Sequence, residues 1–407
     1  MLYQDPMDFP ALTVLDNFIL GQPARSHRLN RAIHEARFCQ LADEFGFRLH
    51  PLIPVEQLTI GERQQLEMLR LLSIGIRVLI LDEPTTGISI QQKKDLFSAL
   101  EKLTKEGKSV LLVSHKIEDV AALCHRVSVL RQGRPAGEME RPFDTTRLLT
   151  MMFGTPPAAP SRGQTPPGKP VLELTDVSAP GGRSGLSTCT ITVHHREIVG
   201  LAGLEGSGQG VLLRVAAGLV SPSKGQIHIE GADLTGCRPR KFQDRRVAFL
   251  PTSRLEEGLI CGLSISEHCF LNEKDAGMFI HWPTAAKNAW ERIRAFRIKG
   301  SPGTPAEALS GGNQQRLLLS FLPEAPNLLL LENPTRGLDL ESAHWVWSHL
   351  NILREEGTGI LFSSSELDEI LMVADRVVVF FDGKIVKDVL AAETSIKDLG
   401  LAIAGGV

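Results

Sequence analysis

Two stretches of the chain repeat the same succession of short apolar runs and longer amphipathic segments. In the first, apolar runs at 78–83 and 109–115 flank an amphipathic segment from about Gln91 to Lys105. In the second, apolar runs at 327–333 and 359–365 flank a segment of similar character. Apolar strands alternating with helical segments predict an α/β fold with a mostly parallel sheet. Ligands of such sheets bind at the carboxyl ends of the strands, where both stretches carry polar residues.

The two stretches are copies of one another. LILDEPTTGIS at 79–89 matches LLLENPTRGLD at 329–339 with a shift of 250 positions. Further upstream, LTIGERQQ at 58–65 matches LSGGNQQR at 309–316 with a shift of 251 positions. A register held over so many residues indicates a tandem duplication.

A linker is predicted between the copies. Residues 154–170 are dense in Pro, Gly and Ser and show no apolar periodicity, which is typical of a semi-rigid connection. The segment divides the chain into domains at 1–153 and 171–407. Two domains agree with a length of 407 residues, because a domain has ~150 residues on average.

Composition excludes several classes of function. The net charge of −3 and the absence of a dense Lys/Arg run argue against a nucleic-acid-binding protein. The most apolar long stretch, 198–220, is interrupted by Glu205, Gln209 and Arg214. It therefore lacks the roughly 18 uninterrupted apolar residues of a membrane span. We expect no transmembrane segment, so that any membrane role requires a partner.

Candidate phosphate chemistry begins at LSGGNQQR, residues 309–316. A Ser and two Gly before a helical run place backbone N–H groups and a hydroxyl at a helix N-terminus, which suits a phosphate oxygen. A turn that only caps a helix is the alternative interpretation. Downstream, an apolar strand ends in Glu332-Asn333, and the first copy has Asp82-Glu83 in the same place.

In combination these motifs resemble the ATP-binding subunit of an ATP-binding cassette (ABC) importer that carries two cassettes on one polypeptide. Residues 309–316 resemble the cassette signature and 79–87 the Walker B strand. His115 resembles the switch histidine, Gln4 the Q-loop glutamine, and GLEGSGQG at 203–210 a degraded phosphate loop. The resemblance implies two tandem P-loop NTPase-like domains, with ATP and Mg²⁺ as cofactors.

The resemblance also implies roles for the residues of the first copy. Asp82 would hold Mg²⁺, through a water, together with Gln4, because this hard cation prefers oxygen ligands. Glu83 would activate the attacking water, and His115 would contact the γ-phosphate. An acidic pair that merely caps a loop is the alternative for Asp82 and Glu83. The γ-phosphate of a nucleotide held by one copy would meet the signature of the other, here Ser310, Gly311, Gly312 and Asn313.

The phosphate loop of the second copy departs from the family pattern. The lysine and hydroxyl positions are Gln209 and Gly210, which removes the charge for the β/γ-phosphates and a ligand of Mg²⁺. The glycines of the backbone cradle remain, so that nucleotide binding is expected without efficient hydrolysis. A purely structural turn is the alternative. The candidate nucleotide contacts in this loop are Gly203, Gly206, Ser207, Gly208, Gln209 and Gly210.

Other losses fall in the same copy. Asn333 replaces the catalytic Glu and Ser365 the switch His, and the sequence reads Leu250-Pro251-Thr252 where the Q-loop Gln would be. The first copy keeps its catalytic residues, but its signature at 58–62 has lost a glycine. Since cassettes of this family pair head to tail, the resemblance implies one active and one degenerate composite site.

The first copy has no counterpart of the strands and phosphate loop that open the second. The second copy begins near Val171, whereas Met1 is equivalent to about Ala248. We therefore expect an N-terminally truncated first cassette, through gene structure or a start codon placed too late. This chain alone is expected to hydrolyse ATP weakly or not at all.

The leading hypothesis is the ATP-hydrolysing subunit of a bacterial importer for simple sugars or nucleosides. LTIGERQQLEML with ENPTRGLD favours the nucleoside or basic-membrane-lipoprotein type. The implied partners are membrane-spanning permeases, docked by the segments 16–50 and 264–308, and through them a substrate-binding lipoprotein. The implied location is cytoplasmic, peripheral on the inner face of the cell membrane. The alternatives are a soluble twin-cassette ATPase that acts on ribosomes or DNA, and an inactive remnant.

Overall fold

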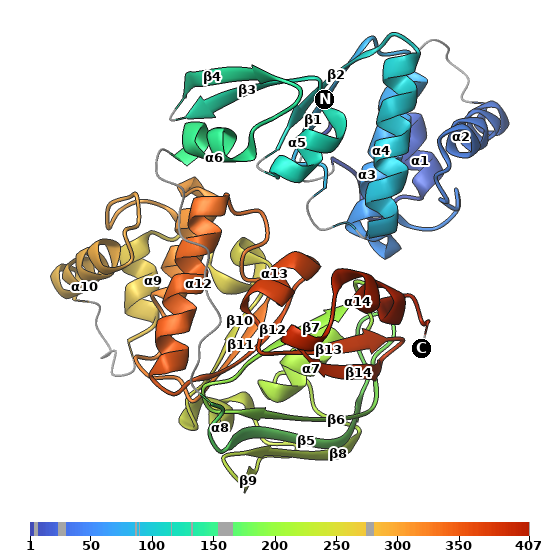
Figure 1. Ribbon diagram of the computed structural model, residues 1–407. Coiled ribbons are helices and arrows are strands. Elements are labelled where there is room, and N and C mark those ends of the chain that lie inside the picture. The colour runs from blue at the N-terminus through green and yellow to red at the C-terminus, as the bar shows by residue number, and fades with distance from the viewer. Residues whose placement is uncertain are drawn as a thin grey trace. The chain divides into compact units, whose positions relative to one another are not determined.

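The computed structural model divides the chain into two compact units, Met1–Pro157 and Ala158–Val407 (Figure 1). It describes residues 1–3, 7–22, 30–85, 88, 90–114, 116–131, 133–153, 166–273 and 281–406. The predicted linker at 154–170 lies mostly outside these residues, and so do Gln4 and His115. Each unit is considered by itself.

The second unit contains two sheets and the helices that cover them. Its strands are β5 Pro170–Ala179, β6 Leu186–His194, β7 Ile198–Gly203, β8 Lys224–Ile229, β9 Ala232–Asp233, β10 Val247–Leu250, β11 Leu328–Glu332, β12 Gly359–Ser363, β13 Arg376–Phe381 and β14 Lys384–Leu390. Its α-helices are α7 Gln209–Ala216, α8 Pro239–Asp244, α9 Ile265–Leu271, α10 Trp282–Ala295, α11 Gly311–Leu319, α12 Leu340–Glu355, α13 Leu367–Val373 and α14 Ile396–Ile403. Single turns of 3-10 helix at Ala306–Ala308 and Ala391–Glu393 and a π-helical turn at Arg254–Gly258 complete it.

The central sheet has the order β10-β11-β12-β7-β13-β14, parallel except for the final antiparallel β13–β14 pair. Every residue of β11 and β12 is buried. Leu329 and Leu331 belong to the core on one face of the sheet, and Leu328 and Leu330 to the core on the other. Burial on both faces explains why these strands are continuous apolar runs rather than alternating ones.

A second, antiparallel sheet has the order β6-β5-β8-β9 and forms a separate layer (Figure 1). Helix α7 contacts β5 of this sheet and β11 and β12 of the central one, so that it packs between the two. The helix starts directly after the loop at 203–208, which follows β7. The phosphate-loop candidate therefore lies where a parallel strand ends and a buried helix begins.

The first unit repeats only part of this arrangement. Its strands are β1 Val78–Asp82, β2 Ser109–Val113, β3 Arg126–Arg131 and β4 Arg134–Glu140. Its α-helices are α1 Val14–Leu20, α2 Arg31–Phe45, α3 Ile60–Ser73, α4 Ile90–Lys105, α5 Ile117–Leu123 and α6 Thr145–Phe153, with a 3-10 turn at Val55–Gln57. Among the described residues of this unit, none forms a counterpart of β5–β9 or of α7.

In this unit β1 pairs in parallel with β2, and Leu2 forms a parallel bridge with Leu81. Leu250 pairs with Leu331 in the same way in the second unit, so that Leu2 stands in the place of Leu250. One face of the β1–β2 pair is open: Val78 and Leu111 are each 56% exposed. The corresponding face of the second unit is covered by α7 and the antiparallel sheet. Apolar surface that the second unit buries is thus exposed in the first.

The expected fold class is confirmed. The apolar runs form parallel strands, and the amphipathic segment from Gln91 to Lys105 forms α4. No helix of the described segments combines the length and the apolar character that crossing a membrane requires.

The carboxylate of Glu369 connects helices to the sheet through hydrogen bonds. Glu369 of α13 accepts hydrogen bonds from Trp347 Nε1 at 2.6 Å, from Ser364 Oγ at 2.5 Å and from the Thr335 hydroxyl. Burial raises the pKa of Glu369, and these donors only partly offset that effect. In the first unit Asp119 takes the equivalent position and accepts a hydrogen bond from Thr85 at 2.5 Å.

We expect Glu369→Ala to destabilise the second unit by about 3 kcal/mol, because it leaves three buried donors without their acceptor. The measurement is the unfolding transition of that unit, followed by circular dichroism in urea. The control is Asp368→Asn, since Asp368 is exposed in the first turn of the same helix. It should cost only about 0.5 kcal/mol. Equal losses of unfolding free energy in the two variants would contradict the assignment of Glu369 as the hydrogen-bond acceptor that connects these helices to the sheet.

Candidate functional site

Asp82 and Glu83 lie at the carboxyl end of β1. The backbone N–H of Asp82 donates to the Leu2 carbonyl at 3.0 Å, and that of Glu83 to the Val113 carbonyl at 3.0 Å. Glu83 has φ +47°, an uncommon conformation for a residue with a long side chain. Its counterpart Asn333 has φ +44°, so the two copies turn the chain identically at this point. Such backbone strain at the end of a strand is typical of functional sites.

The Asp82 carboxylate is partly exposed, and no basic side chain of the described residues forms an ion pair with it. A carboxylate oxygen at a parallel strand end fits Mg²⁺, which takes a few carboxylates and otherwise water or phosphate oxygens. No cluster of three or more His, Cys, Asp or Glu suited to a metal occurs in the described part of the chain. Asp82 can therefore supply one ligand, with water and phosphate oxygens completing the shell. The predicted Gln4 and His115 contacts lie outside the described residues.

The corresponding strand end in the second unit holds a different carboxylate. Glu332 replaces Asp82, and its side chain is only 8% exposed. Arg214 of α7 approaches both of its oxygens, with Nε 3.0 Å from Oε1 and Nη2 3.0 Å from Oε2. Burial raises the pKa of Glu332, and Arg214 partly offsets the rise. For Arg214, burial works to lower the pKa, but bonds and charges from Glu257 and Glu332 raise it overall.

Two other substituted positions of the second copy bond to each other. Asn333 Nδ2 donates to Thr252 Oγ1 at 3.1 Å. Because Leu2 stands in the place of Leu250, Thr252 stands in the place of Gln4. The positions of the predicted base and of the predicted metal ligand are thus occupied in this copy by a neutral, mutually bonded pair. Neither side chain can act as a base.

The loop between β7 and α7 keeps the backbone shape of a phosphate cradle. Gly206 has φ +84° and Gly208 φ +116°, conformations that residues with a Cβ rarely adopt. Gln209 is buried, and its Nε2 donates to the Leu204 carbonyl at 3.3 Å. A Cβ on Gly210 would lie 3.4 Å from Glu332 Oε1, where a hydroxyl residue would meet the strand-end acid. The glycine backbone of the cradle is present. The lysine and the hydroxyl residue of the family pattern are absent, because Gln209 and Gly210 occupy their positions.

The two signature loops differ in charge. In the second unit Asn313 Nδ2 donates to Ser310 Oγ at 2.7 Å, so the start of α11 presents neutral groups. In the first unit Glu62 closes a capping box on Thr59, whose backbone N–H and hydroxyl it accepts at 2.8 and 2.9 Å. The Glu62 carboxylate therefore takes donors that a phosphate would use and adds a like charge. The start of α3 thus carries a carboxylate where the start of α11 carries a neutral amide.

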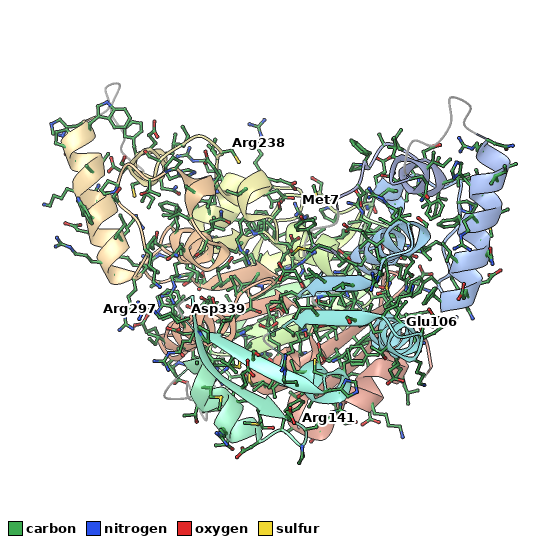
Figure 2. All side chains as sticks on the ribbon, turned by 90° about the horizontal axis from the view of Figure 1, so that it is seen from above. Met7, Glu106, Arg141, Arg238, Arg297 and Asp339 are labelled. Atoms are coloured by element: carbon green, nitrogen blue, oxygen red, sulfur yellow. The ribbon has the colours of Figure 1, made fainter. Side chains whose placement is uncertain are left out.

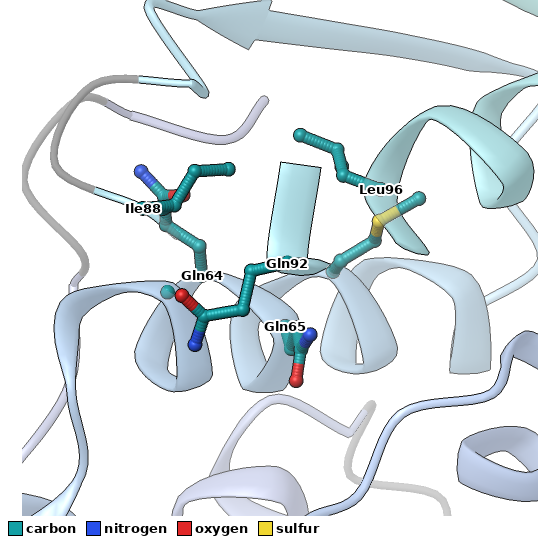
Figure 3. A pocket seen from close by; sticks show the side chains of 7 residues that line it. Gln64, Gln65, Ile88, Gln92 and Leu96 are labelled. Carbon is teal, nitrogen blue, oxygen red and sulfur yellow. The ribbon is translucent and has the colours of Figure 1, made fainter. Parts of the chain in front are cut away.

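One glycine of each signature loop packs against the following helix. A Cβ on Gly312 would lie 2.7 Å from Ser342 Oγ. Ser342 is held by Asp339, labelled in Figure 2, which caps α12 by accepting from the Ser342 N–H at 2.9 Å. In the first unit a Cβ on Gly61 would come within 2.5 Å of the Gln92 amide. Gln92 also borders a pocket between α3 and α4 (Figure 3), lined by Gly61, Gln64, Gln65, Met68, Ile88, Gln92 and Leu96.

Sequence reasoning found the loops and strand ends but missed the pairing of Arg214 with Glu332. A signal was available: Arg214 follows Gly210 by four positions, one helical turn, and so shares its side of α7. Glu257, the second partner of Arg214, lies in an irregular turn that no periodicity indicates.

We expect Gly208→Ala to destabilise the second unit by about 3 kcal/mol, because it adds backbone strain to a steric conflict. The new Cβ would lie 2.9 Å from the Gly185 carbonyl oxygen. Gly231→Ala is the control: Gly231 also has positive φ (+75°), but a Cβ there meets nothing within 4 Å. It should cost about 1 kcal/mol. Urea unfolding of both variants measures the difference, and equal values would show that the loop is not closely packed at Gly208.

Known proteins are similar in sequence to this chain over nearly its whole length. The sequence model described as "ABC transporter" matches residues 1–86 and 186–336. The glucose import ATP-binding protein TsgD13 of Haloferax volcanii is 33% identical, with 100% of this chain and 82% of the relative covered. The nucleoside import ATP-binding protein NupA of Lactococcus lactis is 31% identical, covering 100% and 83%. The ribose import ATP-binding protein RbsA 1 of Rubrobacter xylanophilus is 34% identical, covering 99% and 82%.

A solved structure titled as the ATP-binding subunit of an ABC transporter covers 57% of this chain and 99% of its own, with 23% identity and a TM-score of 0.48. The family match spans more than half of the chain, and relatives above 30% identity align with nearly all of it. These matches confirm the family resemblance that the motifs indicated. The chain belongs to the ABC transporter family, as an ATP-binding cassette protein with the α/β fold of that family.

Proposed function

We propose that this chain is the ATP-hydrolysing subunit that energises import of a simple sugar or a nucleoside. The observation that carries the proposal is the Asp82–Glu83 pair at the end of β1, with Glu83 in a strained backbone conformation. Its relatives bear the names of glucose, nucleoside and ribose import ATP-binding proteins, which supports the substrate class. A ribosome- or DNA-acting cassette is less well supported, because the net charge is −3.

Hydrolysis is assigned to the acids of the first cassette, which need a phosphate loop that the described residues of the first unit do not contain. Asp82 would hold Mg²⁺ through its carboxylate, and the cation, when bound, would neutralise charge on the phosphates of ATP. Glu83 would orient a water and accept its proton as the water attacks the γ-phosphate. The second cassette has Asn333 in this position, bonded to Thr252, so it has no group that can take the proton. We therefore propose one hydrolytic and one non-hydrolytic cassette.

Nucleotide contacts of the second cassette are proposed for the loop from Gly203 to Gly210. Its glycines leave backbone N–H groups at the start of α7, an arrangement that suits phosphate oxygens. In the signature of the same unit, we propose that Ser310, Gly311, Gly312 and Asn313 contact a γ-phosphate.

The membrane connection is proposed to run through partners. These would be permease subunits that span the membrane and, through them, a substrate-binding lipoprotein. The chain would then lie at the inner face of the cell membrane, on the cytoplasmic side. Helices α2, α9 and α10 fall within the segments predicted to dock, 16–50 and 264–308, and α1 overlaps the first of them. Leu271, Trp282 and Trp290 expose 56%, 49% and 45% of their surface, apolar area available to a partner.

The first test is Glu83→Gln in the complex of this chain with the permeases encoded beside its gene. ATP turnover should fall by a factor of about 100 or more, because a positioned base contributes that much. Nucleotide binding, measured with a fluorescent ATP analogue, should change little. Asn333→Ala, the same position in the other cassette, is the matched control and should leave turnover within about twofold. Turnover that survives Glu83→Gln, or a complex without turnover, would refute the proposed hydrolytic cassette.

The second test concerns docking. Trp290→Ser should reduce recovery of the permeases with the tagged chain by about tenfold, because exposed aromatic residues commonly dominate such interfaces. Ile352→Ser is the control, since Ile352 is also exposed (56%) but lies on α12. Quantitative co-purification measures both. A loss of the same size in the two variants would show that α10 is not the docking helix.

A further inference from the structure

The strand-end acid of the second cassette is already neutralised by the protein itself. Arg214 makes a two-pronged contact with Glu332, in which Nε and Nη2 each lie 3.0 Å from a different carboxylate oxygen. This geometry combines two charged contacts with a hydrogen bond from Nη2 to Oε2. The Glu332 side chain is 8% exposed, so the carboxylate is shielded from water, whereas the Arg214 side chain is 31% exposed. In the first cassette Asp82, at the equivalent position, has no such ion pair among the described residues.

Arg214 is held in place from other sides as well. Its Nη2 lies 2.8 Å from Glu257 Oε2 and 3.1 Å from Oε1, and its guanidinium lies 5.4 Å from the ring centre of Phe249. The Thr252 N–H also donates to Glu332 Oε2, at 3.4 Å. Both oxygens of Glu332 therefore face donors, and the cation beside them is fixed by a second carboxylate and a ring.

Mg²⁺ does not fit this site. The ion requires oxygen ligands in near-ideal octahedral geometry at roughly 2.0–2.1 Å, and it releases its water reluctantly. Here the acid is engaged by a guanidinium, and Gly210 supplies no hydroxyl, although a Cβ there would lie 3.4 Å from Glu332 Oε1. Thr252 and Asn333 are bonded to each other. The usual oxygen donors are thus missing or occupied, and a fixed positive charge lies next to the place of the ion.

We infer that the phosphate loop of the second cassette takes its nucleotide without a metal ion, and that Arg214 is the resident cation next to Glu332. This inference rests on the proposed nucleotide binding by that loop. The ligand is then a metal-free nucleoside di- or triphosphate, held by the backbone N–H groups at the start of α7. Arg214 is a positioning residue in this scheme, because it acts through Glu332.

The test uses the full chain with Asp82→Asn, which removes the metal-binding acid of the first cassette. The probe is 8-azido-ATP, crosslinked by light in excess Mg²⁺ or in excess EDTA, with labelled peptides assigned to either unit by mass spectrometry. We expect half-saturation of the Ala158–Val407 unit to agree within about threefold between the two conditions.

Arg214→Met, alone and with Gly210→Ser, is the informative variant, because it frees Glu332 and restores a hydroxyl beside it. Mg²⁺ should then tighten labelling by about tenfold relative to EDTA. Electron paramagnetic resonance with Mn²⁺ and ATP should detect metal bound to this variant and none at the second unit of its parent. Arg240→Met, which removes an exposed arginine of α8, is the control and should behave as the parent.

Two results would overturn the inference. One is a tenfold or greater need for Mg²⁺ in the parent, by roughly the same measure. The other is the absence of label in the second unit under both conditions. Neither depends on the folding of a variant, since both are read from the chain with Arg214 in place. Both also leave the hydrolytic assignment of Glu83 intact, because that assignment is tested by turnover at the other cassette.

Discussion

The charge of a carboxylate at the end of a buried parallel strand must be compensated, and this constraint organises the second cassette. β11 is buried along its whole length, so the carboxylate of Glu332 at its end has little contact with water. An uncompensated carboxylate there would be costly, because burial removes its hydration. Arg214 meets the requirement from α7 and in turn brings Glu257 and the irregular turn at Arg254–Gly258 against the loop. The arrangement of these elements around Glu332 follows from the position of Arg214, a cation that belongs to the protein.

The first cassette meets the same constraint differently. Asp82 is partly exposed and has no basic partner among the described residues, so its charge is free to act on a cation from solution. The signature of the first cassette also carries the Glu62 carboxylate, which closes a capping box on Thr59. The box stabilises α3 but places negative charge where a phosphate would bind. The first copy therefore keeps the candidate catalytic acids, and the second keeps a signature without the added carboxylate. Both differences are local and electrostatic.

Much of this could be predicted from the sequence because the relevant signals are local. The apolar runs that became β11 and β12 are continuous because these parallel strands are covered on two faces. The runs of β1 and β2 could be recognised as their copies. The loss at Asn333 could be read directly against the repeat, and the losses at Gln209 and Gly210 against the family pattern of the phosphate loop. The pairing of Arg214 with Glu332 was missed, although Arg214 shares a side of α7 with Gly210, because the two residues are 118 positions apart and meet only when α7 packs on the sheet. The Asn333–Thr252 bond escaped for the same reason, at a separation of 81.

The backbone at the two strand ends shows why such divergence is possible without loss of the fold. Glu83 and Asn333 share a positive φ although only Glu83 can accept a proton. In both, the N–H donates to the carbonyl of the neighbouring strand, to Val113 at 3.0 Å and to Ser363 at 2.9 Å. Sheet pairing, not catalysis, thus holds the strained turn in place. Since asparagine adopts positive φ more readily than glutamate, the substitution relieves strain as it removes the base. A strand end that carries asparagine in place of the acid can therefore retain the same backbone turn and sheet pairing.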